Sequence, residues 1–321
     1  MNSTNPMVSI CMAAYNHEGF IAKAIESVMM QETDFPIELV IGEDCSPDST
    51  RAICERYAAK YPDRIRLLPS KTNYGMSKNG IRIMNNCRGK YIAILDGDDF
   101  WSDPHKLKMQ VEFLENNPDY GLIHTDVDPV DDSGTPIQAE SVEYRRKNHK
   151  EGYVFFNMLS GFNFINSCTA LFRHDLLKTD ASSIEKYWFA YDFWYWQRIA
   201  MHSKVYYLNK KTACYRMHQG GITNTAQFKK NKLRSYHVLH DVIEQFHMAP
   251  PHSLNEVEKR MIFQKIISLL YRKEGSLRMK LSTLKIMPHY FPGFSGVADI
   301  LLSKIGVRAP LKLASKHSQA S

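Results

Sequence analysis

Three carboxylates follow one short apolar stretch of the sequence. The stretch Tyr91–Leu95 ends in Asp96-Gly97-Asp98-Asp99, and a continuous apolar run of this length is typical of a buried strand. Carboxylates this close together repel one another and lose water on burial, and a hard divalent cation among them offsets both costs. Mg²⁺ or Mn²⁺ takes such ligands and can also bridge a diphosphate and neutralise it as it leaves. The alternative is an Asp-Gly turn whose carboxylates cap the following helix.

A second polar group follows the apolar stretch Ile37–Ile41, which runs into Gly42-Glu43-Asp44. A carboxylate at the end of this strand, beside a strand that ends near Tyr15, can accept a hydrogen bond from a nucleobase while the tyrosine ring stacks on it. The alternative is a capping cluster for the helix that starts at Arg51. Asp48 or Ser49 fits that capping role, whereas Asp44 is too far upstream for it.

The elements around these residues alternate between strand and helix patterns. We expect strands at 8–14, 37–41, 65–68, 91–95 and 120–125, and helices at 18–30, 51–61, 77–87 and 104–116. Short apolar strands alternating with helices predict an α/β fold with a mainly parallel sheet flanked by helices on both faces. Ligands of such sheets bind beyond the carboxyl ends of the strands. The polar groups at three strand ends should therefore share one crevice.

The second half is less regular. The pattern is lost over residues 126–150, which we expect to be an exposed excursion, and the four aspartates at 126–132 miss the spacing of a calcium loop, so turn chemistry explains them better. Beyond it we expect a helix at 152–159, a strand at 166–172, an aromatic-rich helix at 191–201 and strands near 205–208 and 212–217.

Composition excludes several classes of protein. The 321 residues are 44% hydrophobic and 23% charged, as in globular chains rather than disordered ones. No apolar run approaches the roughly 18–20 residues of a membrane span, and the first residues do not resemble a signal peptide, so we expect a cytoplasmic protein. The six cysteines are scattered without a C-x-x-C pair, which favours free buried thiols over disulfides or zinc ligands.

Four motifs together resemble a known family. Val8–Asn16, Glu43–Thr50, Asn73-Tyr-Gly75 and Gly89–Asp99 are similar, in order and spacing, to family 2 glycosyltransferases of the GT-A fold. The similarity is dense over residues 7–118 and weaker to about 225. The resemblance implies a GT-A, Rossmann-like fold and an inverting, metal-dependent transfer of a sugar from a nucleotide sugar, in the bacterial cell-surface polysaccharide type of this family.

The resemblance also implies roles for individual residues. Ala13 and Tyr15 would line the nucleobase, and Asp44 would accept a hydrogen bond from it. Asp96 would contact the ribose side, and Asp98 would bind Mn²⁺ or Mg²⁺ at the diphosphate; the role of Asp99 stays open.

An inverting transfer needs a base for the acceptor hydroxyl. The family usually supplies it from a Glu-Asp pair that opens a helix, and the matching place here is Tyr191-Asp192, so Asp192 is the expected base. Tyr191 replaces the usual glutamate. The alternative is that Asp192 only caps its helix, and the nearby Trp188, Trp194 and Trp196 are expected in the core.

Three further residues correspond to positions around the diphosphate. Tyr215–His218 resembles a segment that closes over it, so Arg216 would bind phosphate and His218 phosphate or metal, although a lone histidine is often structural. An arginine common in the Asn73–Asn79 segment of the family is absent here; Lys78 stands in its place, with a point charge instead of a bidentate fork.

The net charge is distributed unevenly along the chain. Residues 229–321 carry 16 Lys and Arg against 6 Asp and Glu, a net charge of +10 within a total of +7. We expect a GT-A catalytic domain over 1–228, with a nucleotide-sugar half at 1–125 and an acceptor half at 126–228, and a basic, mostly helical extension over 229–321. The extension either packs on the catalytic body or touches an anionic membrane surface peripherally. No nucleic-acid-binding module is visible.

These observations leave three functions open. The first is a glycosyltransferase that uses a nucleotide sugar, with UDP as the expected nucleotide, and a glycan or lipid-linked acceptor. The second is a protein of degenerate fold that binds sugar nucleotide or glycan without turnover, as the tyrosine at 191 allows. The third is a nucleotidyltransferase, but the segment Ala14–Glu18 lacks the glycine-rich basic loop that cradles a triphosphate.

Overall fold

The computed structural model of the chain describes residues 5–158, 163–177 and 191–221. The chain forms two compact units, residues 1–242 and 243–321, and all described residues belong to the first. The predicted domain boundary at 228, the helical extension and Trp188 fall outside the described residues and stay predictions. Within the described part, no helix has the length and apolar character that crossing a bilayer requires.

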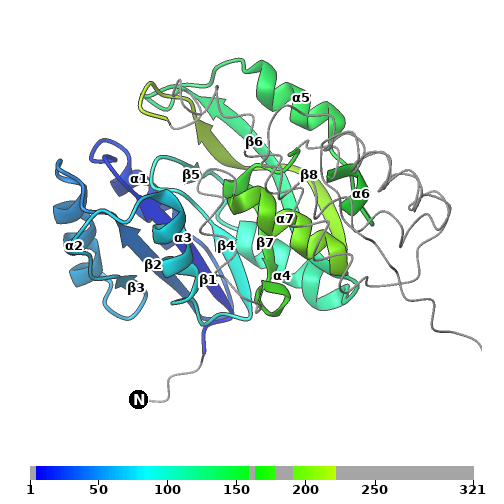
Figure 1. Cartoon of the computed structure of the whole chain (residues 1–321), viewed down its shortest axis with the longest axis horizontal. Coiled ribbons are helices and arrows are strands. Elements are labelled where there is room, and N and C mark those ends of the chain that lie inside the picture. Colours follow the sequence, from blue (N-terminus) through cyan, green and yellow to red (C-terminus); the bar gives the residue numbers. More distant parts are fainter. Residues whose placement is uncertain (1–4, 159–162, 178–190, 222–321) are drawn as a thin grey trace, which may run out of the picture. The chain divides into compact units, whose positions relative to one another are not determined.

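The described strands form one mixed sheet, in the order β3-β2-β1-β4-β7-β6-β8-β5 (Figure 1). Its parallel half consists of β1 (Val8–Ala14), β2 (Ile37–Glu43), β3 (Ile65–Leu67) and β4 (Tyr91–Ile94). The other half consists of β5 (Phe100–Trp101), β6 (Tyr120–Val130), β7 (Leu171–Arg173) and β8 (Lys204–Arg216). There β6 and β8 are parallel, whereas β7 is antiparallel to β4 and β6, and β5 is antiparallel to β8.

Helices connect and cover these strands. They are α1 (Ile21–Met29), α2 (Thr50–Lys60), α3 (Met76–Met84), α4 (Lys106–Asn116), α5 (Glu140–Asn148), α6 (Phe155–Met158) and α7 (Tyr191–His202), with short 3₁₀ turns at Ser167–Thr169 and His174–Leu177. α3 contacts β1 and β2, α4 contacts β6 and β7, and α7 contacts β6.

The alternation of side chains along β1 separates the two faces of the sheet. Val8, Ile10, Met12 and Ala14 belong to a buried core that they share with α1 and α4. The intervening Cys11 and Ala13 face the other side, where residues of α3 and Tyr195 of α7 meet them. The functional residues of β1 and β4 thus emerge between α3 and α7.

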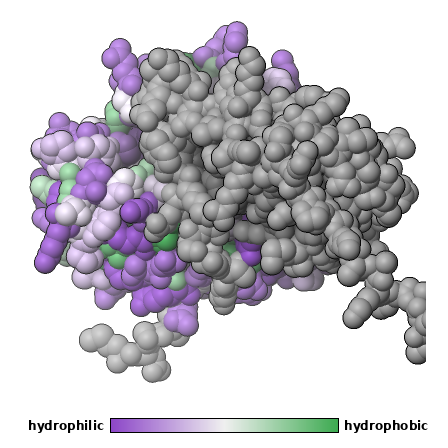
Figure 2. Space-filling model, viewed as in Figure 1, coloured by the Kyte–Doolittle hydropathy of each residue, from purple (hydrophilic) through white to green (hydrophobic). Residues whose placement is uncertain are grey.

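The surface visible in Figure 2 is mainly hydrophilic over the described residues. Two tyrosines near the predicted site are exposed, Tyr15 by 44% and Tyr74 by 40% of their surface. Both follow the strand-end loops of the parallel half, where the sequence predicts a nucleobase.

Several sequence predictions for the second half are wrong. Residues 126–150 are not a featureless excursion, because β6 extends to Val130 and α5 follows at Glu140–Asn148. The strand expected at 166–172 is a 3₁₀ turn followed by β7, the helix expected at 152–159 is the shorter α6, and the two strands expected near 205–217 are one strand, β8. The six cysteines are free as predicted, but Cys45 is only partly buried.

Candidate active site

The parallel register brings the predicted strand ends together. Ala14 lies beside Glu43 at the ends of β1 and β2. Beyond β4, the backbone N–H of Gly97 donates to the carbonyl of Ala13 at 2.8 Å. Ala13, Asp44 and Asp96 therefore stand at one edge of the sheet, as the sequence predicts.

Asp98 lies between two histidines. Its Oδ2 is 3.1 Å from His218 Nε2 and 3.8 Å from His17 Nε2. Burial alone would raise the pKa of Asp98, but the hydrogen bond to His218 and the interaction with His17 outweigh it and lower that pKa. The predicted pair Asp98 and His218 is thus in direct contact, although these residues are 120 positions apart in the chain.

Asp96 and Asp192 lie near each other at the same edge. Burial raises the pKa of Asp96 to about 8, and the charges of Asp98 and Asp192 add to the shift. Asp192 also has a raised pKa because it is buried, partly offset by its hydrogen bonds and by the charge of Arg145. The predicted base is therefore close enough to Asp96 for its charge to act on that carboxyl.

Asp192 is held from two sides. Its Oδ2 accepts a hydrogen bond from Asn163 Nδ2 at 3.3 Å, and its Oδ1 accepts from the backbone N–H of Phe193 at 2.7 Å. The second bond satisfies a backbone N–H in the first turn of α7, in line with the alternative interpretation that Asp192 stabilises the start of its helix. The two interpretations coexist, because a carboxylate offers about four lone-pair positions. Trp194 and Trp196, which follow on α7, are fully buried as predicted.

Asp99 has a structural function that the sequence leaves open. Its Oδ1 accepts a hydrogen bond from the backbone N–H of Arg216 at 2.8 Å, so it ties the end of β8 to the acidic turn. Burial, followed by the charge of Asp98, raises its pKa well above the usual range.

Arg216 makes several contacts within the protein. Its Nε donates to the carbonyl of Asp98, and its Nη1 donates to the carbonyls of Asp131 and Asp132. The guanidinium also lies over the ring of Phe20, 4.6 Å from its centroid. Only 5% of the residue is exposed. These contacts tie Arg216 to the acidic turn, and its predicted contact with phosphate stays a prediction.

Asp44 holds the loop that precedes α3. Its two oxygens accept hydrogen bonds from the backbone N–H groups of Tyr74 and Gly75, both at 2.8 Å. Gly75 has φ +77°, a conformation that glycine adopts without strain. At the start of α2, Asp48 accepts a hydrogen bond from the backbone N–H of Thr50, and Ser49 at the N-cap position makes no capping bond with its side chain; Asp44 contacts neither and is not a cap of this helix.

Lys78 and Arg82 lie on the same helix, α3. Lys78 is exposed. Arg82 donates to the carbonyls of Pro69 and Glu43 and stacks on the ring of Tyr74. Because these acceptors occupy the Arg82 guanidinium, Lys78 remains the candidate cation of this segment.

The donor atoms of Asp98 and His218 fit a divalent cation. No group of three His, Cys, Asp or Glu side chains within the described ranges is already arranged around an ion. Two ligands of one ion at about 2.1 Å stand about 3 Å apart when they are adjacent, which matches the 3.1 Å between these two atoms. One carboxylate oxygen and one imidazole nitrogen suit Mn²⁺ and leave positions for diphosphate oxygens.

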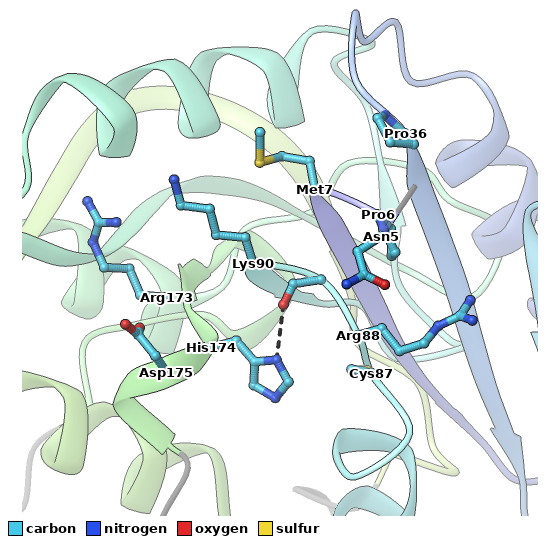
Figure 3. A pocket seen from close by; sticks show the side chains of 11 residues that line it. Asn5, Pro6, Met7, Pro36, Cys87, Arg88, Lys90, Arg173, His174 and Asp175 are labelled. Atoms are coloured by element: carbon cyan, nitrogen blue, oxygen red, sulfur yellow. Dashed lines mark hydrogen bonds between the residues drawn. The ribbon is translucent and has the colours of Figure 1, made fainter. Parts of the chain in front are cut away.

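A separate cavity lies at the opposite edge of the parallel strands. It has a volume of about 700 Å³ and is lined by residues before β1 and around the start of β4 (Figure 3). Its cations already have partners: Lys90 pairs with Glu115, and Arg88 pairs with Glu38. The cavity is at the amino ends of the parallel strands, so it is separate from the candidate active site.

Sequence reasoning missed His17, Asn163 and Arg145. His17 directly follows the strand-end pair Tyr15-Asn16, and this position could have indicated it. Asn163 lies outside any helix or strand, and Arg145 lies on α5, a helix that the sequence pattern does not predict; the approach of both to Asp192 depends on tertiary contacts.

Comparisons with known proteins identify the family of the chain. Residues 9–179 match the description Glycosyl transferase family 2. The uncharacterised protein Rv1520 of Mycobacterium tuberculosis is 30% identical over 231 residues, which are 70% of this chain and 63% of that protein; the chain thus spans less than two thirds of this relative. A Bacillus subtilis protein named as a teichuronic acid biosynthesis glycosyltransferase, TuaG, is 31% identical over 137 residues, 41% of this chain and 53% of that protein.

Two solved structures share the fold, which confirms the GT-A prediction. Staphylococcus aureus TarS in complex with UDP has a TM-score of 0.56 at 18% identity and covers 92% of this chain and 82% of its own. The mannosyltransferase PcManGT of Pyrobaculum calidifontis, in complex with GDP-Man and Mn²⁺, has a TM-score of 0.51 at 15% identity, with 95% and 80% covered.

Proposed function

This chain belongs to glycosyl transferase family 2, and we propose that it transfers a sugar from a nucleoside diphosphate sugar to a hydroxyl group of a glycan or lipid-linked acceptor in polysaccharide assembly. One observation carries the proposal: Asp96, the Asp98–His218 pair and Asp192 converge at one sheet edge from three separate segments. The names of the relatives support it, since TuaG is named for teichuronic acid biosynthesis and the structural neighbours hold UDP or GDP-Man.

The donor would lie across the ends of β1, β2 and β4. The ring of Tyr15 is exposed enough to stack on a nucleobase, and Ala13 would also line the nucleobase. Asp44 retains free lone pairs after its two backbone contacts and can still accept from a base N–H. Asp96 would bind the ribose side, and Lys78 would approach the phosphates. We favour a UDP sugar.

Asp98 and His218 would hold Mn²⁺ or Mg²⁺ at the diphosphate. When bound, the ion supplies positive charge to the leaving diphosphate. The residues around the pair fix its geometry: Asp99 and Arg216 anchor the acidic turn to the end of β8.

Asp192 would be the base of an inverting transfer. Its carboxylate takes the proton of the acceptor hydroxyl as the oxygen attacks the anomeric carbon, and the nucleoside diphosphate departs from the opposite face. Asn163 holds the carboxylate, and the charge of Arg145 keeps its pKa from rising further. The proximity of Asp192 to Asp96 supports this role.

Calorimetric titration with UDP tests the donor and metal sites. We expect the wild type to bind UDP more tightly with Mn²⁺ than without it, and Asp98→Ala to lose this difference. Asp63→Asn, which changes an exposed carboxylate away from the site, should behave as the wild type. If Mn²⁺ does not affect UDP binding by the wild type, the metal-dependent mechanism is wrong.

The base requires a separate test. Asp192→Asn should abolish transfer from a UDP sugar while UDP and Mn²⁺ still bind, because the amide cannot accept the proton. Turnover at the wild-type rate in this variant would exclude Asp192 as the base. Binding without transfer in the wild type, with every UDP sugar tried, would favour the non-catalytic alternative.

A further inference from the structure

His17 lies beneath the acidic turn and is fixed there by its backbone. Its N–H donates to Thr50 Oγ1 at 2.8 Å, and its carbonyl accepts from the N–H groups of Phe20 and Ile21 at 2.9 and 2.8 Å, where α1 begins. The side chain is only 15% exposed. The imidazole therefore has little freedom to leave its position.

The ring packs against Gly97 and points at Asp98. A Cβ added to Gly97 would lie 2.9 Å from His17 Nδ1 and 2.7 Å from Ile21 Cδ1, so the glycine of the acidic turn makes room for this histidine. The other nitrogen, Nε2, lies 3.8 Å from Asp98 Oδ2. His17 thus approaches the same oxygen that contacts His218.

The two ring nitrogens of His17 have different surroundings. Nδ1 is buried and has no hydrogen-bond partner. A neutral imidazole carries one N–H, and a buried N–H without an acceptor is rarer in proteins than an under-used acceptor. We therefore place the proton on Nε2, where it faces the Asp98 carboxylate.

We propose that His17 is a positioning residue that orients Asp98 for the divalent cation, taking over as hydrogen-bond donor when His218 turns to the ion. This inference rests on the proposed function. His218 Nε2 can donate to Asp98 or give its lone pair to an ion, but it cannot do both. With His218 holding the ion, His17 Nε2–H would be the donor that faces Oδ2, from which it is 3.8 Å away in this structure, and a small rotation of the Asp98 carboxyl would bring the two atoms into hydrogen-bonding range.

Two substitutions separate hydrogen bonding from packing. His17→Phe keeps a ring of similar shape against Gly97 but has no donor, whereas His17→Gln keeps an N–H near the position of Nε2. Manganese affinity of the full chain is measured by electron paramagnetic resonance of free Mn²⁺, with and without UDP. We expect His17→Phe to weaken Mn²⁺ binding by about 10–100-fold, as loss of an outer-shell partner does, and His17→Gln to stay within about threefold of the wild type.

Other outcomes overturn the inference in distinguishable ways. Wild-type affinity in His17→Phe would exclude the role, and equal losses in both variants would show that His17 is itself a ligand or acts only by packing. His105→Phe, at a histidine that is 54% exposed and paired with Glu32, serves as the matched control and should not change Mn²⁺ affinity. If the wild type binds no Mn²⁺, or Asp98→Ala binds it equally well, the metal site of the proposed function is wrong and the role of His17 falls with it.

Discussion

The carboxyl of Asp96 should make the ligand-free protein less stable as the pH rises. Burial, with the charges of Asp98 and Asp192, raises its pKa from 3.8 to about 8. Between these values the unfolded chain has lost the proton and the folded chain keeps it, so the free energy of unfolding falls with increasing pH. The slope is at most about 1.4 kcal/mol per pH unit, which gives a loss of about 2–3 kcal/mol between pH 5 and pH 7.

Asp96→Asn removes this titration, because an amide has the shape of the carboxyl and takes no charge. The melting temperatures of wild type and variant, without metal or nucleotide, should diverge as the pH rises from 5 to 7, with the variant gaining roughly 4–6 °C relative to the wild type. Asp63→Asn, at an exposed position, controls for the loss of one negative charge and should follow the wild type. Parallel pH dependence in wild type and Asp96→Asn would refute the argument that Asp96 is held protonated by burial and by its acidic neighbours.

Two further predictions concern other titrating groups. Burial lowers the pKa of Lys106 to about 7. Above that pH the folded chain lacks a proton that the unfolded chain still holds, so the free energy of unfolding in urea should rise between pH 7 and 9. Lys106→Met should flatten this rise, and an unchanged slope in the variant would contradict the prediction. Arg145 helps to lower the pKa of Asp192 against the larger effect of burial. Arg145→Gln should therefore move the acidic limb of the profile of transfer activity against pH to higher pH. Lys147→Gln, at an exposed position, should leave that limb in place. Coincident profiles for Arg145→Gln and wild type would rule out an effect of the Arg145 charge on Asp192.

The parallel half of the fold was predictable because its signals are local. β1 spans Val8–Ala14 as expected, and β2 and β4 match their apolar runs to within two residues. Strands that are buried on both faces need continuous apolar sequence, so the pattern alone locates them. Their carboxyl ends then define where the site lies.

The second half was less predictable because its strands carry polar residues whose partners come from far along the chain. Asp126 of β6 pairs with Arg146 of α5, and Asp128 of β6 pairs with Lys211 of β8. The sequence alone predicts loops for these residues. Register shifts between β6 and β8 further break the period-two pattern that would have revealed two long strands.

The acidic turn shows why residue types and spacing give the location of a site but not the function of each member. In the sequence Asp96, Asp98 and Asp99 are equivalent carboxylates, whereas in the fold successive residues of the turn point in different directions. Asp96 meets Asp192, Asp98 meets two histidines, and Asp99 accepts the backbone N–H of Arg216. Each neighbour comes from a segment at least 75 positions away, so only the tertiary structure distinguishes a carboxyl beside another carboxyl, one between two histidines and one that fixes the backbone. The same holds for His17, because its side chain approaches Asp98 only where the loop after β1 lies next to the turn that follows β4.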